Sequence, residues 1–197
     1  ILEAEAVQRA IAIAELTGCP IYIVHVSSAR ALAVIRQAQE KRLPVTAETC
    51  PQYLLLDESR YMTEDFTAAK YVMSPPLRGK DNQEALWQGL REGVVSCVGS
   101  DHCSFNYLTQ KEIGRKDFSR IPNGIPGVEN RFGLLYGFGV AAGKISLSQF
   151  VDCISTGPAK LFGLYPRKGC LRVGSDADIV VWDPAAHWKI AAATQAQ

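Results

Sequence analysis

Two short apolar runs, each followed by a residue that can bind a metal ion, constrain the fold of this chain most. Residues 21–24 read Ile-Tyr-Ile-Val and precede His25, and residues 94–98 read Val-Val-Ser-Cys-Val and lead to Asp101. Apolar runs of this length are typical of strands buried on both faces in a parallel sheet. In a barrel of parallel strands, the chemistry lies at the C-terminal strand ends. We therefore expect His25 and Asp101 at such an edge, where an imidazole and a carboxylate could hold a divalent cation and activate water.

Each candidate residue also has a structural interpretation. His25 could donate to a backbone carbonyl at its strand end, and Asp101 could cap the following turn. His102 follows Asp101 directly, so its side chain should point the other way, and we expect it to border the site at most. Cys103 has no predicted base beside it, which favours a buried thiol over a nucleophile. Glu48, in a second predicted strand, is either paired or faces the pocket.

The order of predicted elements indicates an α/β fold. A helix at 2–17 ends at Gly18, and a strand at 21–26, a helix at 28–41 and a strand at 44–50 follow. Alternation at this spacing is typical of βα units with a parallel sheet. Further on, we expect a helix at 81–92, a strand at 94–99, a long loop at 104–126, helices at 129–142, 147–154 and 159–162, and strands at 171–173 and 179–182.

Composition excludes several classes of function. The net charge is +1, from 21 basic and 20 acidic residues, and no basic run stands out, so we expect neither nucleic acid nor a membrane surface as a partner. No apolar run reaches the roughly 18 residues of a membrane span. Six cysteines without C-x-x-C spacing favour a reducing, cytoplasmic setting. There is no G-x-S-x-G, P-loop or G-x-G-x-x-G motif.

Seven short sequence blocks, taken in their order along the chain, indicate a family resemblance. They are VHVSS at 24–28, ETCPQYLLLD at 48–57, SPPLR at 74–78, GSDHC at 99–103, IPNGIP at 121–126, AKLFG at 159–163 and GSDADIV at 174–180. Together they resemble the C-terminal half of the hydantoinase/dihydropyrimidinase family of the amidohydrolase superfamily, nearest to the bacterial D-hydantoinase and phenylhydantoinase type. The resemblance covers residues 1–184, and we expect the chain to be a piece of a longer protein.

The resemblance implies the C-terminal part of a (β/α)₈ TIM-type barrel, with strands six to eight at residues 1–165 and part of a small β-sandwich at 166–197. Such enzymes hold two divalent metal ions, usually zinc, bridged by a carbamylated lysine. Their first strand supplies an H-x-H pair, the fourth the lysine and the fifth a histidine. This chain has three histidines and no H-x-H, so those ligands are absent from it. A complete barrel alone needs about 250 residues.

Residue by residue, the resemblance makes His25 a metal ligand of the sixth strand and Asp101 a ligand of the eighth. Asp101 would also be the general base. Ser74 and Asn123 match positions that hold the cyclic amide, largely through backbone groups. Gln52 favours the hydantoinase branch, because related allantoinases and dihydroorotases often carry histidine there.

The implied function is metal-dependent hydrolysis of hydantoins or dihydropyrimidines, which are cyclic ureides, to N-carbamoyl amino acids by a homotetrameric parent protein. We expect the isolated chain to be inactive. Three alternatives stay open: a non-catalytic scaffold related to dihydropyrimidinase, a self-associating fragment with covered sheet edges, and an allantoinase or dihydroorotase relative.

Overall fold

Three short parallel strands form the centre of the fold. The computed structural model describes residues 1–195. The strands β1 (Ile21–Ile23), β2 (Val45–Thr49) and β3 (Cys97–Val98) pair in the order β1-β2-β3. Ile21 lies opposite Val45, and Glu48 lies opposite Cys97. This is the parallel βα arrangement that the sequence predicts.

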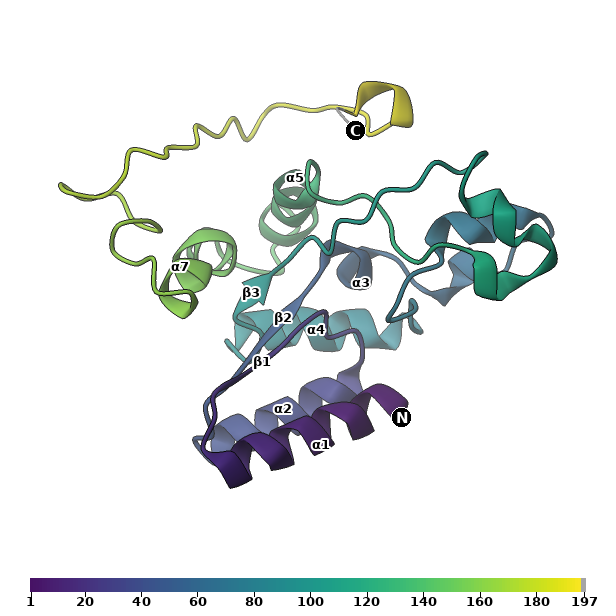
Figure 1. The fold of residues 1–197 in the computed structure, drawn as a ribbon. Helices are drawn as coiled ribbons and strands as arrows, with labels where there is room; N and C mark the ends of the chain where they lie inside the picture. The colour runs from purple at the N-terminus through teal and green to yellow at the C-terminus, as the bar shows by residue number, and fades with distance from the viewer. Residues whose placement is uncertain (196–197) are drawn as a thin grey trace.

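Helices α1 (Leu2–Thr17), α2 (Ala29–Glu40) and α4 (Asp81–Arg91) gather on one side of the strands, with α1 and α2 side by side (Figure 1). Gly18 ends α1 in the left-handed conformation, with φ of 68°, as the sequence predicts. Ser28 begins α2 by accepting a hydrogen bond from the Ala31 amide. These two boundaries fix the short connections that lead into and out of β1.

The core lies between the sheet and the helices. Along β2, Val45, Ala47 and Thr49 are buried, whereas the alternating residues between them are only half-buried. Trp87 of α4 is fully buried, and its indole Nε1 donates to the carbonyl oxygen of Leu54 at 3.3 Å. Leu54 belongs to α3 (Pro51–Leu55), which begins directly after β2. Trp87 therefore joins α4 to the segment that follows the central strand.

Two loop regions far apart in sequence form a neighbouring lobe of short 3₁₀ helices. The first holds η1 (Glu58–Tyr61) and η2 (Phe66–Tyr71), and the second holds η3 (Lys111–Lys116) and η4 (Phe118–Arg120). η2 contacts η3, and Figure 1 shows the two regions together on one side of the strands. The long loop predicted at 104–126 thus packs against residues 58–76.

The later helices are less regular than the sequence predicts, because α-helical and π-helical turns alternate in them. The expected helix at 129–142 is α5 (Arg131–Leu135) followed by the π-helical η5 (Tyr136–Val140). The expected helices at 147–154 and 159–162 are α6 (Leu147–Val151), the π-helical η6 (Asp152–Thr156) and α7 (Gly157–Leu161). A Cβ atom at Gly139 would lie 3.0 Å from the Trp87 ring. Glycine there lets η5 approach the core closely.

The prediction of strands at 171–173 and 179–182 is wrong for the described chain. Residues 171–173 enter an exposed turn, closed by the Ser175 amide donating to the Arg172 carbonyl oxygen at 3.1 Å, and residues 179–182 are mostly exposed chain without regular structure that leads toward η7 (Ala192–Thr194) (Figure 1). A strand requires a partner for its backbone hydrogen bonds, and within residues 1–195 no segment pairs with either one. Among these residues, no helix has the length and apolar character needed to cross a membrane.

Candidate active site

His25 and Asp101 lie beyond the carboxyl ends of the two strands that flank β2. His25 comes two residues after β1, and Asp101 comes three residues after β3. Backbone bonds continue past both strands: the Val26 amide donates to the Glu48 carbonyl oxygen at 2.8 Å, and the Gly99 amide donates to that of Thr49 at 2.9 Å. The end of β2 therefore holds both loops, and the two predicted ligands share one edge of the sheet.

Both residues have an uncommon backbone conformation. φ is 42° at His25 and 45° at Asp101, and among the described residues Arg42 is the one other non-glycine residue with positive φ. Histidine and aspartate tolerate this region better than most residues, but it costs free energy that surrounding structure must offset. Within residues 1–195, neither side chain makes a hydrogen bond to another residue, so neither the carbonyl donation nor the capping role is observed. Strained, unpaired polar groups of this kind are typical of functional sites.

The donor set in the described chain is incomplete for a catalytic metal. His25 and Asp101 offer one imidazole nitrogen and one carboxylate, whereas a catalytic zinc site has three protein ligands. Across residues 1–195, no group of three histidine, cysteine, aspartate or glutamate side chains could hold a metal ion. The chemistry of the two residues fits a divalent cation, and a full site requires ligands from outside this chain.

Ser74 and Asn123, the predicted substrate-binding residues, are exposed and lie in neighbouring loops. The Gly124 amide donates to the Val72 carbonyl oxygen at 3.0 Å, which joins the two loops. Among the described residues, neither Ser74 nor Asn123 makes a hydrogen bond through backbone or side chain. Their peptide groups are therefore free to bind a ligand while adjacent residues are held.

A partly buried ionic cluster, which sequence reasoning missed, connects the loop after His25 with the segment after Ser74. The Glu3 carboxylate accepts bonds from the Ser27 amide at 2.8 Å, the Ser27 hydroxyl at 2.6 Å and Arg78 Nη2 at 3.1 Å. Arg78 Nε also donates to the Ser27 hydroxyl oxygen at 3.2 Å. Three separate elements meet here, and the sequence shows only isolated polar residues.

We expect the Glu3→Gln substitution in the full-length protein to lower the free energy of unfolding by about 1–2 kcal/mol. The change removes the charge that binds Arg78, and the partial exposure of the pair keeps the loss below that of a fully buried ion pair. Chemical denaturation measures it. Glu5→Gln, on the exposed face of the same helix, is the control and should change stability by less than about 0.5 kcal/mol. Equal effects in the two variants would contradict the role of the cluster.

The remaining polar candidates have defined partners. Glu48 is paired, because its carboxylate accepts from the Tyr22 hydroxyl at 2.7 Å. Burial, with a further contribution from Glu48, raises the pKa of Tyr22 well above its usual value. His102 Nδ1 accepts from the Gly127 amide at 3.1 Å and so ties down the loop after Asn123. The prediction of a buried Cys103 thiol is wrong: the side chain is exposed, because the residue lies in the loop beyond β3.

The start of α3 borders Asp101. Burial raises the pKa of the Cys50 thiol, and the negative charges of Glu48 and Asp101 raise it further. Burial likewise raises the pKa of Tyr53, with smaller contributions from Cys50 and Asp101. The Tyr53 hydroxyl donates to the Pro75 carbonyl oxygen at 2.9 Å. Tyr53 therefore connects the surroundings of Asp101 with the segment that contains Ser74.

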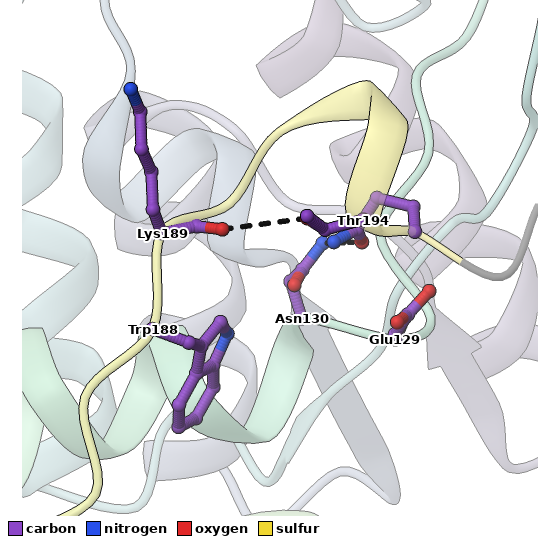
Figure 2. A pocket seen from close by; sticks show the side chains of 6 residues that line it. Glu129, Asn130, Trp188, Lys189 and Thr194 are labelled. Carbon is purple, nitrogen blue, oxygen red and sulfur yellow. Dashed lines mark hydrogen bonds between the residues drawn. The ribbon is translucent and has the colours of Figure 1, made fainter.

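A separate cavity of about 500 Å³ opens between the start of α5 and the C-terminal segment (Figure 2). It is lined by Glu129, Asn130, Trp188, Lys189, Thr194 and Gln195. Asn130 Nδ2 donates to the Gln195 side-chain oxygen at 2.6 Å, and the Thr194 hydroxyl donates to the Lys189 carbonyl oxygen at 3.4 Å. None of the predicted site residues lines this cavity, so it is distinct from the candidate active site.

Comparison with known proteins agrees with a segment of a parallel α/β barrel. The model of the amidohydrolase family matches residues 12–196. The chain is 52% identical over 193 residues to a D-hydantoinase of Geobacillus stearothermophilus, covering 98% of this chain. It is 50% identical over 183 residues to a D-phenylhydantoinase of Escherichia coli O1:K1, covering 92% of this chain and 39% of that protein. The chain therefore belongs to the amidohydrolase family.

Solved structures give the same result for the fold. A D-hydantoinase (dihydropyrimidinase) from Thermus sp. superposes with a TM-score of 0.94 at 45% identity, over 98% of this chain and 42% of that one. The predicted fold class, part of a TIM-type barrel, is confirmed. The chain spans 41% of the length of the Geobacillus relative.

Proposed function

We propose that the full-length protein hydrolyses the cyclic amide C–N bond of hydantoins or dihydropyrimidines to give N-carbamoyl amino acids. The observation that carries this proposal is the placement of His25 and Asp101, strained and unpaired, at one carboxyl edge of a parallel sheet. The names of the relatives, D-hydantoinase and D-phenylhydantoinase, support the substrate class.

The residues of this chain have separate roles in the proposed reaction. Two divalent metal ions, proposed to be zinc with a carbamylated lysine from outside this chain, would supply hydroxide near neutral pH and polarise the carbonyl oxygen. His25 offers a ring nitrogen as ligand. Asp101 offers a carboxylate as ligand, takes the proton of the attacking water and delivers it to the leaving nitrogen. Ser74 and Asn123 orient the cyclic amide through their free peptide groups.

The proposal also covers the compartment, the assembly and the domain division of the protein. Six free cysteines agree with a reducing cytoplasm. Homotetramer assembly rests on the family resemblance alone. The proposed division places the partial barrel at residues 1–165 and the start of the β-sandwich at 166–197.

Substrate profiling of the full-length protein tests the proposal. We expect ring opening of hydantoin, 5-phenylhydantoin or dihydrouracil, followed by appearance of the N-carbamoyl product in a chromatographic assay. Turnover confined to allantoin or dihydroorotate would assign the protein to those branches of the family. Absence of turnover on every cyclic amide by the metal-loaded protein would favour the non-catalytic scaffold.

The isolated 197-residue chain should neither open hydantoin nor retain zinc through dialysis against a chelator, because it offers two of the required ligands. Metal analysis and the ring-opening assay measure this, with the full-length protein as the positive control and circular dichroism as the check of folding. Tight stoichiometric zinc together with turnover would contradict the prediction. Light scattering that shows a monomer would also exclude the self-associating fragment.

A further inference from the structure

A buried lysine lies between the two loops that carry Ser74 and Asn123. Lys111, at the start of η3, is 3% exposed. Its ammonium Nζ donates to the carbonyl oxygens of Val72 at 2.9 Å, Pro122 at 2.7 Å and Gly124 at 2.8 Å. An ammonium has three protons to donate, so these bonds use all of them. No carboxylate within residues 1–195 forms an ion pair with it.

The three carbonyl groups belong to residues that surround the predicted substrate contacts. Val72 precedes Ser74 by two positions, while Pro122 and Gly124 flank Asn123 on both sides. Ser74 and Asn123 themselves keep unpaired peptide groups among the described residues. Lys111 therefore fixes the neighbours of both residues and leaves the binding groups free, which is the arrangement that a pre-organised ligand site requires.

Lys111 is itself held in place from its own loop. Its amide donates to the Asn106 carbonyl oxygen at 3.1 Å, and its ammonium lies 5.3 Å from the centroid of the Phe105 ring. On the far side, Gly124 approaches Cys103 so closely that an added Cβ would lie 2.5 Å from the Cys103 Cβ. Cys103 follows Asp101 by two residues. The loop that carries Asn123 therefore contacts the segment that carries the predicted base.

We propose that Lys111 is a positioning residue that holds the Ser74 and Asn123 segments in the single arrangement that binds the cyclic amide. The inference rests on the proposed function for its substrate, but the ordering of the two segments can be measured separately. A lysine is suited to this task because its hydrogen bonds to carbonyl oxygens are charge-assisted and so stronger than neutral ones. Its single Nζ atom also brings all three carbonyl groups to one point. Lys111 touches neither substrate nor metal.

The test uses Lys111→Met in the full-length protein, with Lys116→Met at an exposed position of the same helix as the matched control. For hydantoin hydrolysis we expect KM to rise about tenfold or more in K111M while kcat stays within about threefold, the pattern of lost uniform substrate binding. Metal content should be unchanged. Hydrogen–deuterium exchange should increase in peptides that cover residues 72–74 and 121–125, including the Gly124 amide. K116M should match the unsubstituted protein in all of these measurements.

Each other outcome decides the proposal. K111M with the KM and exchange of K116M would overturn it, as would a fall in kcat with lost metal at unchanged KM. If the unsubstituted protein opens none of hydantoin, 5-phenylhydantoin and dihydrouracil, the proposed function fails, and the exchange comparison alone decides whether Lys111 orders the two segments. If K111M does not fold, Lys111→Arg replaces it. That variant keeps the charge, but its planar guanidinium fits three convergent carbonyls poorly, so an elevated KM is expected and a normal KM would contradict the proposal.

Discussion

The Asp101→Asn substitution in the full-length protein should lower kcat for hydantoin ring opening by about a thousandfold or more. Asparagine has nearly the same shape but cannot accept a proton, and general acid–base catalysis alone contributes about 10²–10⁴-fold. The substitution also removes a charged metal ligand from the edge of the sheet. The loss should persist at saturating zinc, because added metal restores occupancy but not the base. Steady-state kinetics together with metal analysis separates the two effects.

Asp152→Asn is the matched control, because Asp152 is an exposed aspartate of η6 outside the candidate site. It should leave kcat and KM unchanged. If D101N retained kcat once zinc was saturating, another group would have to be the base, and Asp101 would be a ligand at most. If both variants lost activity equally, the loss would report general destabilisation of the barrel.

The sequence predicted the elements whose signals are local. The apolar runs before His25 and Asp101 gave two of the three strands, and Gly18 gave the end of α1. β1 ends three residues earlier than predicted because the chain turns into the left-handed conformation at His25, which hydrophobic periodicity does not register. The prediction of strands near the C-terminus is wrong for another reason. A strand is defined by its partner, and the local pattern carries no information about whether a partner is present.

The residues of the candidate site likewise differ in whether the local sequence indicates them. His25 and Asp101 could be proposed because each follows a strand, whereas Ser74 and Asn123 came from the resemblance to the hydantoinase/dihydropyrimidinase family. Lys111 gave no sequence signal, since a lysine in a charged loop normally lies in water. Its role depends on three carbonyl groups at sequence separations of 11 to 39 residues. Contacts between residues this far apart in sequence can be identified only in the folded structure.

The second large effect concerns stability. We expect Trp87→Ala in the full-length protein to lower the free energy of unfolding by about 3–5 kcal/mol, the usual cost of removing a large buried aromatic side chain. The indole is fully buried, so its loss leaves a cavity bordered by Gly139 and Ile145 of the neighbouring segments. It also leaves the Leu54 carbonyl oxygen without its indole donor. Denaturant titration should show a lower midpoint.

The position of Trp87 also predicts a functional consequence that distinguishes it from an ordinary core residue. Leu54 follows Tyr53, whose hydroxyl bonds to the Pro75 carbonyl oxygen beside Ser74. Loosening α3 should therefore raise KM for hydantoin before the barrel unfolds. Gln88→Ala, at the next and exposed position of α4, should change neither stability by more than about 0.5 kcal/mol nor KM. A W87A protein with reduced stability but unchanged KM would show that α3 keeps its place without the indole, and that the substrate loops depend on their own contacts.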